Sequence, residues 1–164
     1  LVLADGAPWI WNVAADRWRG ATEVLDFYHA SQHLWELGRA VVGRDGPAVA
    51  AWVEPRLHRL RHGKERAVVA EVAALHPPRG PRGAVVRREQ SYLAGQVARA
   101  RMPYARVAAR GWPIGSGAVE SACRLRQCRC KRPGQFWTAR GLRHLCALEE
   151  ARANGHWDQL WLTA

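Results

Sequence analysis

The chain has 164 residues, with 25 Lys and Arg against 14 Asp and Glu, and carries a formal net charge of +11. Hydrophobic residues make up 48% and include nine Trp, which argues against a disordered chain. The charge favours polyanionic partners such as DNA, RNA or acidic membranes, and nearly all the cations are arginines, which bind phosphate bidentately. No apolar stretch approaches the roughly 20 residues needed to span a bilayer, and no signal peptide is recognisable, so we expect a cytosolic protein.

Two short apolar runs near the start of the chain predict two strands. Residues 1–4 stop at Asp5, and residues 22–25 stop at Asp26. The stretch between them, residues 7–19, is compatible with a helix or an irregular connection. A strand, a crossover and a second strand imply a parallel pair, whose functional residues are expected at the carboxyl ends.

Helical spacing of apolar residues dominates the middle of the chain. Four helices are predicted there, over residues 29–43, 47–62, 64–75 and 84–110. We expect Pro55 to restart a helix rather than lie inside one, and Pro103 to bend the last of the four. Three Pro and two Gly in residues 76–83 mark the clearest hinge in the chain.

The last third begins with a Gly-Ser-Gly turn that leads into a helix with Glu120 in its first turn. Thr138 is a candidate N-cap for a final long helix that stops at Asn154-Gly155. The four cysteines lie in this third, without a secretory marker, and we expect inert buried thiols rather than disulfides or a zinc site; they are Cys123, Cys128, Cys130 and Cys146.

Asp5 at a strand end and Glu120 at a helix start are groups that could hold divalent metals. Phosphoryl transfer in nucleic acids uses two metal ions roughly 4 Å apart, which activate the attacking oxygen and stabilise the leaving one. Oxygen ligands of this kind suit Mg²⁺. From the residues alone, a turn is a competing explanation of Asp5, and capping of the helix dipole is the favoured explanation of Glu120.

Five segments resemble insertion-sequence transposases of the DDE group, specifically the ISKra-like branch. The segments are residues 1–12, 25–35, 104–117, 112–137 and 154–161, in the order of the family. The most specific match is the G-S-G-x-V-E-S-A-C pattern around Glu120. The resemblance implies that Asp5 is the second aspartate of the catalytic set and Glu120 its glutamate, with Mg²⁺ or Mn²⁺ as cofactor. The first aspartate of the family would come from a strand upstream of Leu1.

The resemblance also implies a partial ribonuclease-H-like α/β fold, predominantly helical with a two-strand parallel sheet remnant. The expected parts are residues 1–29 (sheet remnant), 30–110 (helical insertion before the Glu120 helix) and 111–164 (catalytic helix and closing helices). Glu120, Arg124, Gln127 and Lys131 share one helix side by periodicity. We expect DNA contacts from Arg124, Arg129, Lys131 and Trp137. Trp112 and Trp137 could stack on an unpaired base, but we expect them to be core residues.

Three further polar residues lie in the segment 25–35. His29 and His33 have the i, i+4 spacing of a helical zinc pair, but residue 30 is Ala instead of an acid. The missing acid argues against a zinc site, and the resemblance implies that this histidine pair packs and forms hydrogen bonds near the site. The resemblance also implies that Asp26 supports the site, whereas a strand-end acid paired with an arginine explains it as well.

The sequence thus predicts a C-terminal piece of a bacterial DDE transposase, whose intact form cuts transposon ends and joins them to target DNA. Because the first carboxylate is missing and the chain begins inside a strand, we expect a truncated reading frame and weak or no activity of the piece alone. The expected partners are transposon-end and target DNA without a membrane, in the bacterial cytoplasm, and a homo-oligomer of the intact transposase stays open. The alternatives are a non-catalytic basic helical nucleic-acid-binding module and a decayed transposase remnant.

Overall fold

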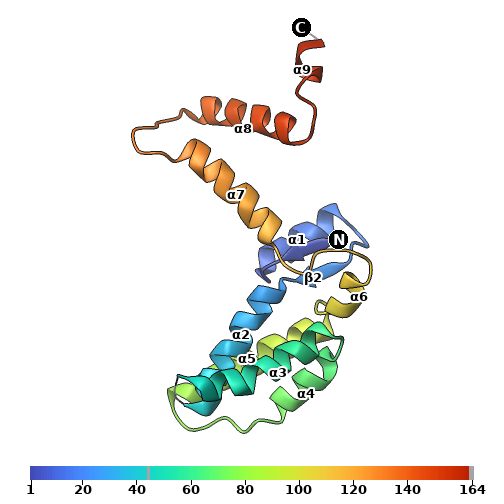
Figure 1. Cartoon of the computed structure of the whole chain (residues 1–164), viewed down its shortest axis with the longest axis vertical. Coiled ribbons are helices and arrows are strands. Elements are labelled where there is room, and N and C mark those ends of the chain that lie inside the picture. Colours follow the sequence, from blue (N-terminus) through green and yellow to red (C-terminus); the bar gives the residue numbers. More distant parts are fainter. Residues whose placement is uncertain (44, 163–164) are drawn as a thin grey trace. The chain divides into compact units, whose positions relative to one another are not determined.

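In the computed structural model of the protein, a small parallel sheet and the helix between its strands begin the chain (Figure 1). Strand β1 (Val2–Ala4) pairs in parallel with β2 (Glu23–Leu25), and Leu3 lies opposite Val24. Helix α1 (Pro8–Arg17) forms the crossover. The predicted parallel pair is confirmed, and the connection whose structure the sequence left open is a helix.

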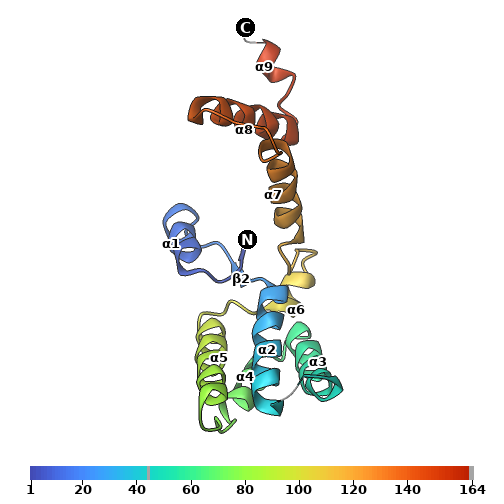
Figure 2. The same cartoon turned by 90° about the vertical axis from the view of Figure 1, so that its left-hand side faces the viewer.

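Five helices follow: α2 (Phe27–Val42), α3 (Pro47–Arg61), α4 (Glu65–Ala73), α5 (Pro81–Ala98) and α6 (Tyr104–Ala108). Helix α2 lies between α5 and α3, and α4 packs on α5 and α3 (Figure 2). Gly38 of α2 permits the close approach of α3, since a Cβ there would lie 2.6 Å from Cγ2 of Val53. The core of these helices includes the fully buried side chains of Leu34, Leu37, Val53, Val86 and Leu93.

Helix α3 continues through Pro55, so the prediction that Pro55 restarts a helix is wrong. An interior proline costs about 3 kcal/mol through its missing N–H and its clash with the preceding turn. Val53 and Leu60, on either side of it, are fully buried, and each such side chain contributes roughly 1.5–3 kcal/mol. Packing of this face therefore outweighs the local preference.

The predicted helix over residues 84–110 is also wrong, because the structure has two helices there, α5 and α6. Helix α5 begins earlier than expected, with Pro81 in its first turn, where a missing N–H costs little. After it, Ala100 adopts a φ of +54°, and the carbonyl of Arg101 accepts a hydrogen bond of 2.7 Å from the N–H of Leu25. The chain leaves the helix to pair with the edge of β2, a long-range contact that the local pattern does not contain.

The structure describes residues 1–43 and 45–162, which form two compact units, Leu1–Ser116 (the first unit) and Gly117–Ala164 (the second unit). The expected sheet remnant and helical insertion thus lie in one unit, and the boundary falls after Ser116 rather than after residue 110. The second unit contains α7 (Gly117–Cys130), α8 (Ala139–Ala153) and α9 (Gln159–Leu162).

Local signals set the limits of α8. The predicted N-cap is confirmed, because the side-chain oxygen of Thr138 accepts a hydrogen bond of 3.0 Å from the N–H of Gly141. The helix ends at Asn154, as predicted, whereas the short helix α9 was not expected. None of the described residues of the second unit is buried. In the described part of the chain, no helix combines the length and apolarity that crossing a bilayer requires.

Candidate functional site

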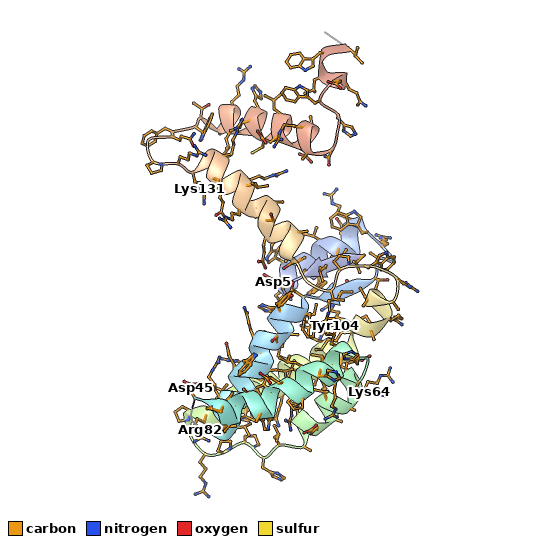
Figure 3. The ribbon with its side chains drawn as sticks, in the orientation of Figure 1. Asp5, Asp45, Lys64, Arg82, Tyr104 and Lys131 are labelled. Carbon is orange, nitrogen blue, oxygen red and sulfur yellow. The ribbon has the colours of Figure 1, made fainter. Side chains whose placement is uncertain are left out.

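Asp5 and Asp26 follow the carboxyl ends of two neighbouring parallel strands. The N–H of Asp26 donates to the carbonyl of Ala4 at 2.7 Å, so the strand pairing extends to the edge where both acids lie. Asp5 is exposed, and its Oδ1 accepts a hydrogen bond of 3.0 Å from the N–H of Ala7. The structure therefore places Asp5 on the surface at the sheet edge, beside the start of α2 (Figure 3).

Asp26 is buried and is held by hydrogen bonds from main-chain and hydroxyl groups. Its Oδ1 accepts from the N–H of His29 at 2.9 Å and caps α2, and its Oδ2 accepts from the N–H of Ser116. Burial raises the pKa of Asp26, but hydrogen bonds from Ser116, His29 and Tyr28 outweigh it and hold the pKa below its usual value. Asp26 is thus ionised and holds the local structure together. Its carboxylate is bound by main-chain and hydroxyl groups, so the explanation that paired Asp26 with an arginine is wrong.

The turn before α7 is bound along the start of α2. Besides the contact between Ser116 and Asp26, the carbonyl of Ile114 accepts from the N–H of Phe27 at 2.9 Å. Gly115 lies so close to the ring of Tyr28 that a Cβ would approach it to 2.7 Å. Three of the segments that carry the family resemblance therefore meet at this sheet edge: residues 1–12, 25–35 and 104–117.

A buried acid and an aromatic ring from α5 join the two histidines of α2. Oε2 of Glu89 lies 2.5 Å from Nδ1 of His33, and Nε2 of His33 lies 3.3 Å from Nε2 of His29. The ring of Tyr92 stacks on His33, with centroids 3.8 Å apart. The expected hydrogen bonding of the histidine pair is confirmed. Among the residues that the structure describes, no three His, Cys, Asp or Glu are grouped as a metal site would require.

Glu89 is fully buried and ionised. Burial raises the pKa of Glu89, but hydrogen bonds from His33 and Arg88 lower this pKa by more than burial raises it. The pKa of Glu89 therefore lies below its usual value. Glu89 was not predicted as a site residue, although its position in the sequence is unusual for a charged side chain. Glu89 falls in a stripe with helical spacing whose other members are small, apolar or amide residues: Gly83, Val86, Leu93 and Gln96. A charged residue on such a face calls for a specific partner.

A hollow of about 270 Å³ opens at the sheet edge and is lined by Asp5, Gly6, Ala7, His29, His33 and Tyr92. Gly6 has a φ of +92°, and a Cβ there would lie 2.4 Å from the hydroxyl of Tyr92. Burial, with the charge of Asp5, raises the pKa of Tyr92 to about 12, so this phenol stays protonated at neutral pH. The predicted catalytic Asp5 thus shares one surface hollow with both histidines.

Glu120 and the predicted DNA-binding residues belong to the second unit. Glu120 lies in the first turn of α7, and it, Arg124, Arg129 and Lys131 are exposed. Lys131 directly follows the end of α7 (Figure 3). Nε of Arg129 lies 3.2 Å from a carboxylate oxygen of Glu149, so its charge is partly compensated within the unit.

Helices α7 and α8 enclose a hollow of about 340 Å³ with four arginines in its lining: Arg126, Arg129, Arg132 and Arg152. Trp137 donates from its indole nitrogen to the carbonyl of Cys130 at 3.1 Å and keeps 43% of its surface exposed. Trp112 is 38% exposed. The expectation that both tryptophans are core residues is therefore wrong, because each keeps more than a third of its surface exposed.

The four cysteines are free thiols, as expected, but the prediction that they are buried is wrong. Cys123 and Cys128 are exposed, and Cys130 and Cys146 are half-buried. The reason is that α7 and α8 form a hairpin too small to cover any of its described side chains fully.

The arrangement offers an exposed carboxylate beside two imidazoles in the first unit, and an acid followed by a row of cations in the second. Carboxylate oxygens suit a hard divalent cation, and arginines suit phosphate. Comparison with known protein families, curated proteins and solved structures yields no match to this chain.

Proposed function

We propose that the chain is the C-terminal part of a bacterial DDE transposase with a ribonuclease-H-like catalytic domain. The intact protein cuts transposon-end DNA and joins it to target DNA by metal-dependent phosphoryl transfer. The proposal is supported above all by the hydrogen bond between Ser116 and Asp26. This bond joins the Gly-Ser-Gly turn, which precedes Glu120 in the sequence, to the sheet edge where Asp5 lies.

Asp5 is suited to the role of a metal-binding carboxylate. It is exposed and follows a buried strand end, so that its main chain is fixed, and its Oδ1 accepts from the N–H of Ala7 while the side chain stays accessible to water. Mg²⁺ retains several water ligands and takes only one or two protein carboxylates, a requirement that an exposed carboxylate meets. In this proposal Asp5 and Glu120 would hold Mg²⁺ or Mn²⁺, which would supply charge stabilisation at the scissile phosphodiester.

The cations of α7 and Lys131, which directly follows it, supply the DNA contacts in this proposal. Arg129 is tethered to Glu149, and Glu149 also pairs with Arg152 at 3.0 Å. Arg124 and Lys131 therefore contribute more positive charge to a phosphate backbone than Arg129 does. Trp137 offers an exposed ring face, on which an unpaired base of the transposon end stacks.

The test is cleavage of a labelled transposon-end duplex by the intact transposase in Mg²⁺ or Mn²⁺. We expect Asp5→Asn and Glu120→Gln each to lower the cleavage rate more than about 100-fold. The reason is that removing a metal ligand lowers activity more than removing a residue that only hydrogen-bonds to the ligand. Asp16→Asn is the matched control, since Asp16 is an exposed acid on α1 whose carboxylate lies 3.3 Å from Nε of the neighbouring Arg17. Wild-type cleavage by both site variants would contradict the proposal.

A non-catalytic nucleic-acid-binding module is the second candidate, and the exposed, arginine-lined hairpin of α7 and α8 favours it. A module of this kind binds DNA with the same dependence on salt as the transposase, but it does not cleave DNA when a metal ion is supplied. A decayed transposase remnant keeps the fold and lacks activity even when the upstream catalytic segment is supplied. Strand-transfer assays with and without that segment distinguish the remnant from the transposase.

A further inference from the structure

Behind the hollow that holds Asp5, a buried carboxylate and two imidazoles form a continuous hydrogen-bonded chain. It begins at Glu89, which is fully buried, and passes through Nδ1 and Nε2 of His33 to Nε2 of His29. Both histidines line the hollow together with Asp5. The chain therefore connects the interior of the first unit with the proposed catalytic edge.

Hydrogen-bonding roles in this chain follow from the chemistry of its first member. An ionised carboxylate only accepts hydrogen bonds, so Nδ1 of His33 carries a proton. When both rings are neutral, Nε2 of His33 is then the acceptor, and the proton between the rings belongs to Nε2 of His29. This assignment leaves Nδ1 of His29 without a proton.

The surroundings hold His33 in this orientation from several sides. Tyr92 stacks on its ring, and Arg88 binds the other carboxylate oxygen of Glu89 at 2.6 Å. Burial of a carboxylate costs several kcal/mol, whereas a leucine on the same stripe of α5 would add to the apolar core. Core packing alone therefore does not explain Glu89, whereas control of a histidine tautomer does.

Building on the proposed function, we propose that Glu89 and His33 are positioning residues that fix the tautomer of His29, and that His29 accepts a proton from the water that attacks the phosphodiester. The water oxygen forms a bond to phosphorus, and the bond from phosphorus to the 3′ oxygen breaks. One proton of the water passes to Nδ1 of His29. The departing 3′ oxygen takes a proton from solvent, which gives a 3′-hydroxyl and a 5′-phosphate, and His29 then returns its proton to solvent.

The first test measures the tautomers directly by long-range ¹H–¹⁵N NMR on the ¹⁵N-labelled 164-residue chain, at a pH where the histidines are neutral. We expect the proton of His29 on Nε2 and that of His33 on Nδ1. Glu89→Gln keeps this pattern, because its amide oxygen still accepts from His33, and Glu89→Leu loses it. Glu71→Gln is the control, since it removes a different carboxylate, which pairs with Arg56 and Arg59. This substitution leaves the hydrogen bonds between Glu89, His33 and His29 in place.

If Glu89→Leu fails to fold, His33→Phe replaces it, because a phenyl ring keeps the stacking on Tyr92 and removes both nitrogens. A mixture of His29 tautomers in this variant supports the proposal. A wild-type His29 with its proton on Nδ1, or a His29 signal unchanged in a folded Glu89→Leu or His33→Phe variant, overturns it.

The second test measures single-turnover cleavage by the intact transposase at saturating DNA. We expect His29→Ala and Glu89→Leu to lower the rate about 100-fold or more without weakening DNA binding, and Glu89→Gln to recover most of the loss. If Asp5→Asn abolishes cleavage while His29→Ala cleaves normally, the role of His29 is wrong and the proposed function stands. If Asp5→Asn also cleaves normally, both proposals fail.

Discussion

The first and second units form helices of similar length by different means. In the first unit, α2 and α5 bury continuous stripes of side chains against their neighbours. In the second, α7 and α8 have no buried residue among those described, and α8 relies on local signals such as the cap at Thr138. An apolar stripe in a sequence therefore predicts a helix in both cases, but it does not predict how much stability the helix receives from packing.

The two units also differ in the burial of their charged groups. The first unit buries Asp26 and Glu89 and assigns a specific partner to each carboxylate oxygen. The second unit exposes its arginines, and its ion pairs join the half-buried Glu149 to the exposed Arg129 and Arg152. Buried polar groups fix geometry, whereas exposed charges act over distance and respond to salt. The first unit is thus suited to position reacting groups, and the second to attract a polyanion.

The largest expected contrast comes from truncating one leucine in each unit. Leu34→Ala in α2 removes a fully buried side chain, and we expect a loss of about 2–5 kcal/mol in the free energy of unfolding. Leu148→Ala in α8 removes a side chain that is 42% exposed and should cost roughly 0.5 kcal/mol. Urea denaturation followed by circular dichroism measures both. Equal losses would show that the second unit gains a packed core in solution.

A pair of glycine substitutions sharpens the same contrast. Gly38→Ala places a Cβ 2.6 Å from Val53 at the contact of α2 and α3, and we expect a destabilisation of about 1–3 kcal/mol from overpacking. Gly117→Ala, at the start of α7, meets no heavy atom within 4 Å and should be neutral or stabilising by up to about 1 kcal/mol. Thermal unfolding reports both. A neutral Gly38→Ala would mean that the two helices separate readily.

Acid should weaken the first unit through its buried carboxylates. The pKa values of Asp26 and Glu89 are lower in the folded state than their ordinary values of 3.8 and 4.5. The stability that they contribute is therefore complete above about pH 4.5 and is lost as the pH falls through the lower, folded-state values. We expect Glu89→Gln to flatten the dependence of the unfolding free energy on pH below this value. The exposed Glu150→Gln is the control, and an equal flattening there would assign the effect to general charge.

The smallest expected effect concerns the salt dependence of DNA binding. Lys131→Ala should lower the slope of log affinity against log salt concentration by about 0.9, the value for one lost phosphate contact. Arg61→Ala, an exposed cation at the end of α3, should leave the slope unchanged. Fluorescence anisotropy with a labelled duplex at several salt concentrations measures the slopes. Equal changes would place DNA on both units.

The elements that sequence analysis predicted well are those with local causes. The strands that end at Asp5 and Asp26, the stop of α2 at Gly43 and the cap at Thr138 each depend on residues within a few positions of one another. The failures have distant causes. Helix α3 passes through Pro55 because of its packed face, and the break after α5 depends on a hydrogen bond to Leu25.

The same division holds for the candidate site. Asp5 and Glu120 were predicted as site residues from a strand end, a helix start and a family pattern, all of which are contained in consecutive residues. Glu89 was missed, because its meaning depends on a partner 56 positions away. The periodicity of α5 does not predict which imidazole of α2 will lie against Glu89, because the pairing depends on how the two helices pack.

Consecutive residues fix the net charge of the chain and were sufficient to predict the limits of many of its elements, because neighbouring residues interact whatever the remainder of the chain does. The contact of Ser116 with Asp26 and the hydrogen bonds that link Glu89, His33 and His29 depend instead on the tertiary structure. Such contacts arise when packing removes water from groups that are distant in sequence, and a buried polar group must then find its partner among those that packing brings near.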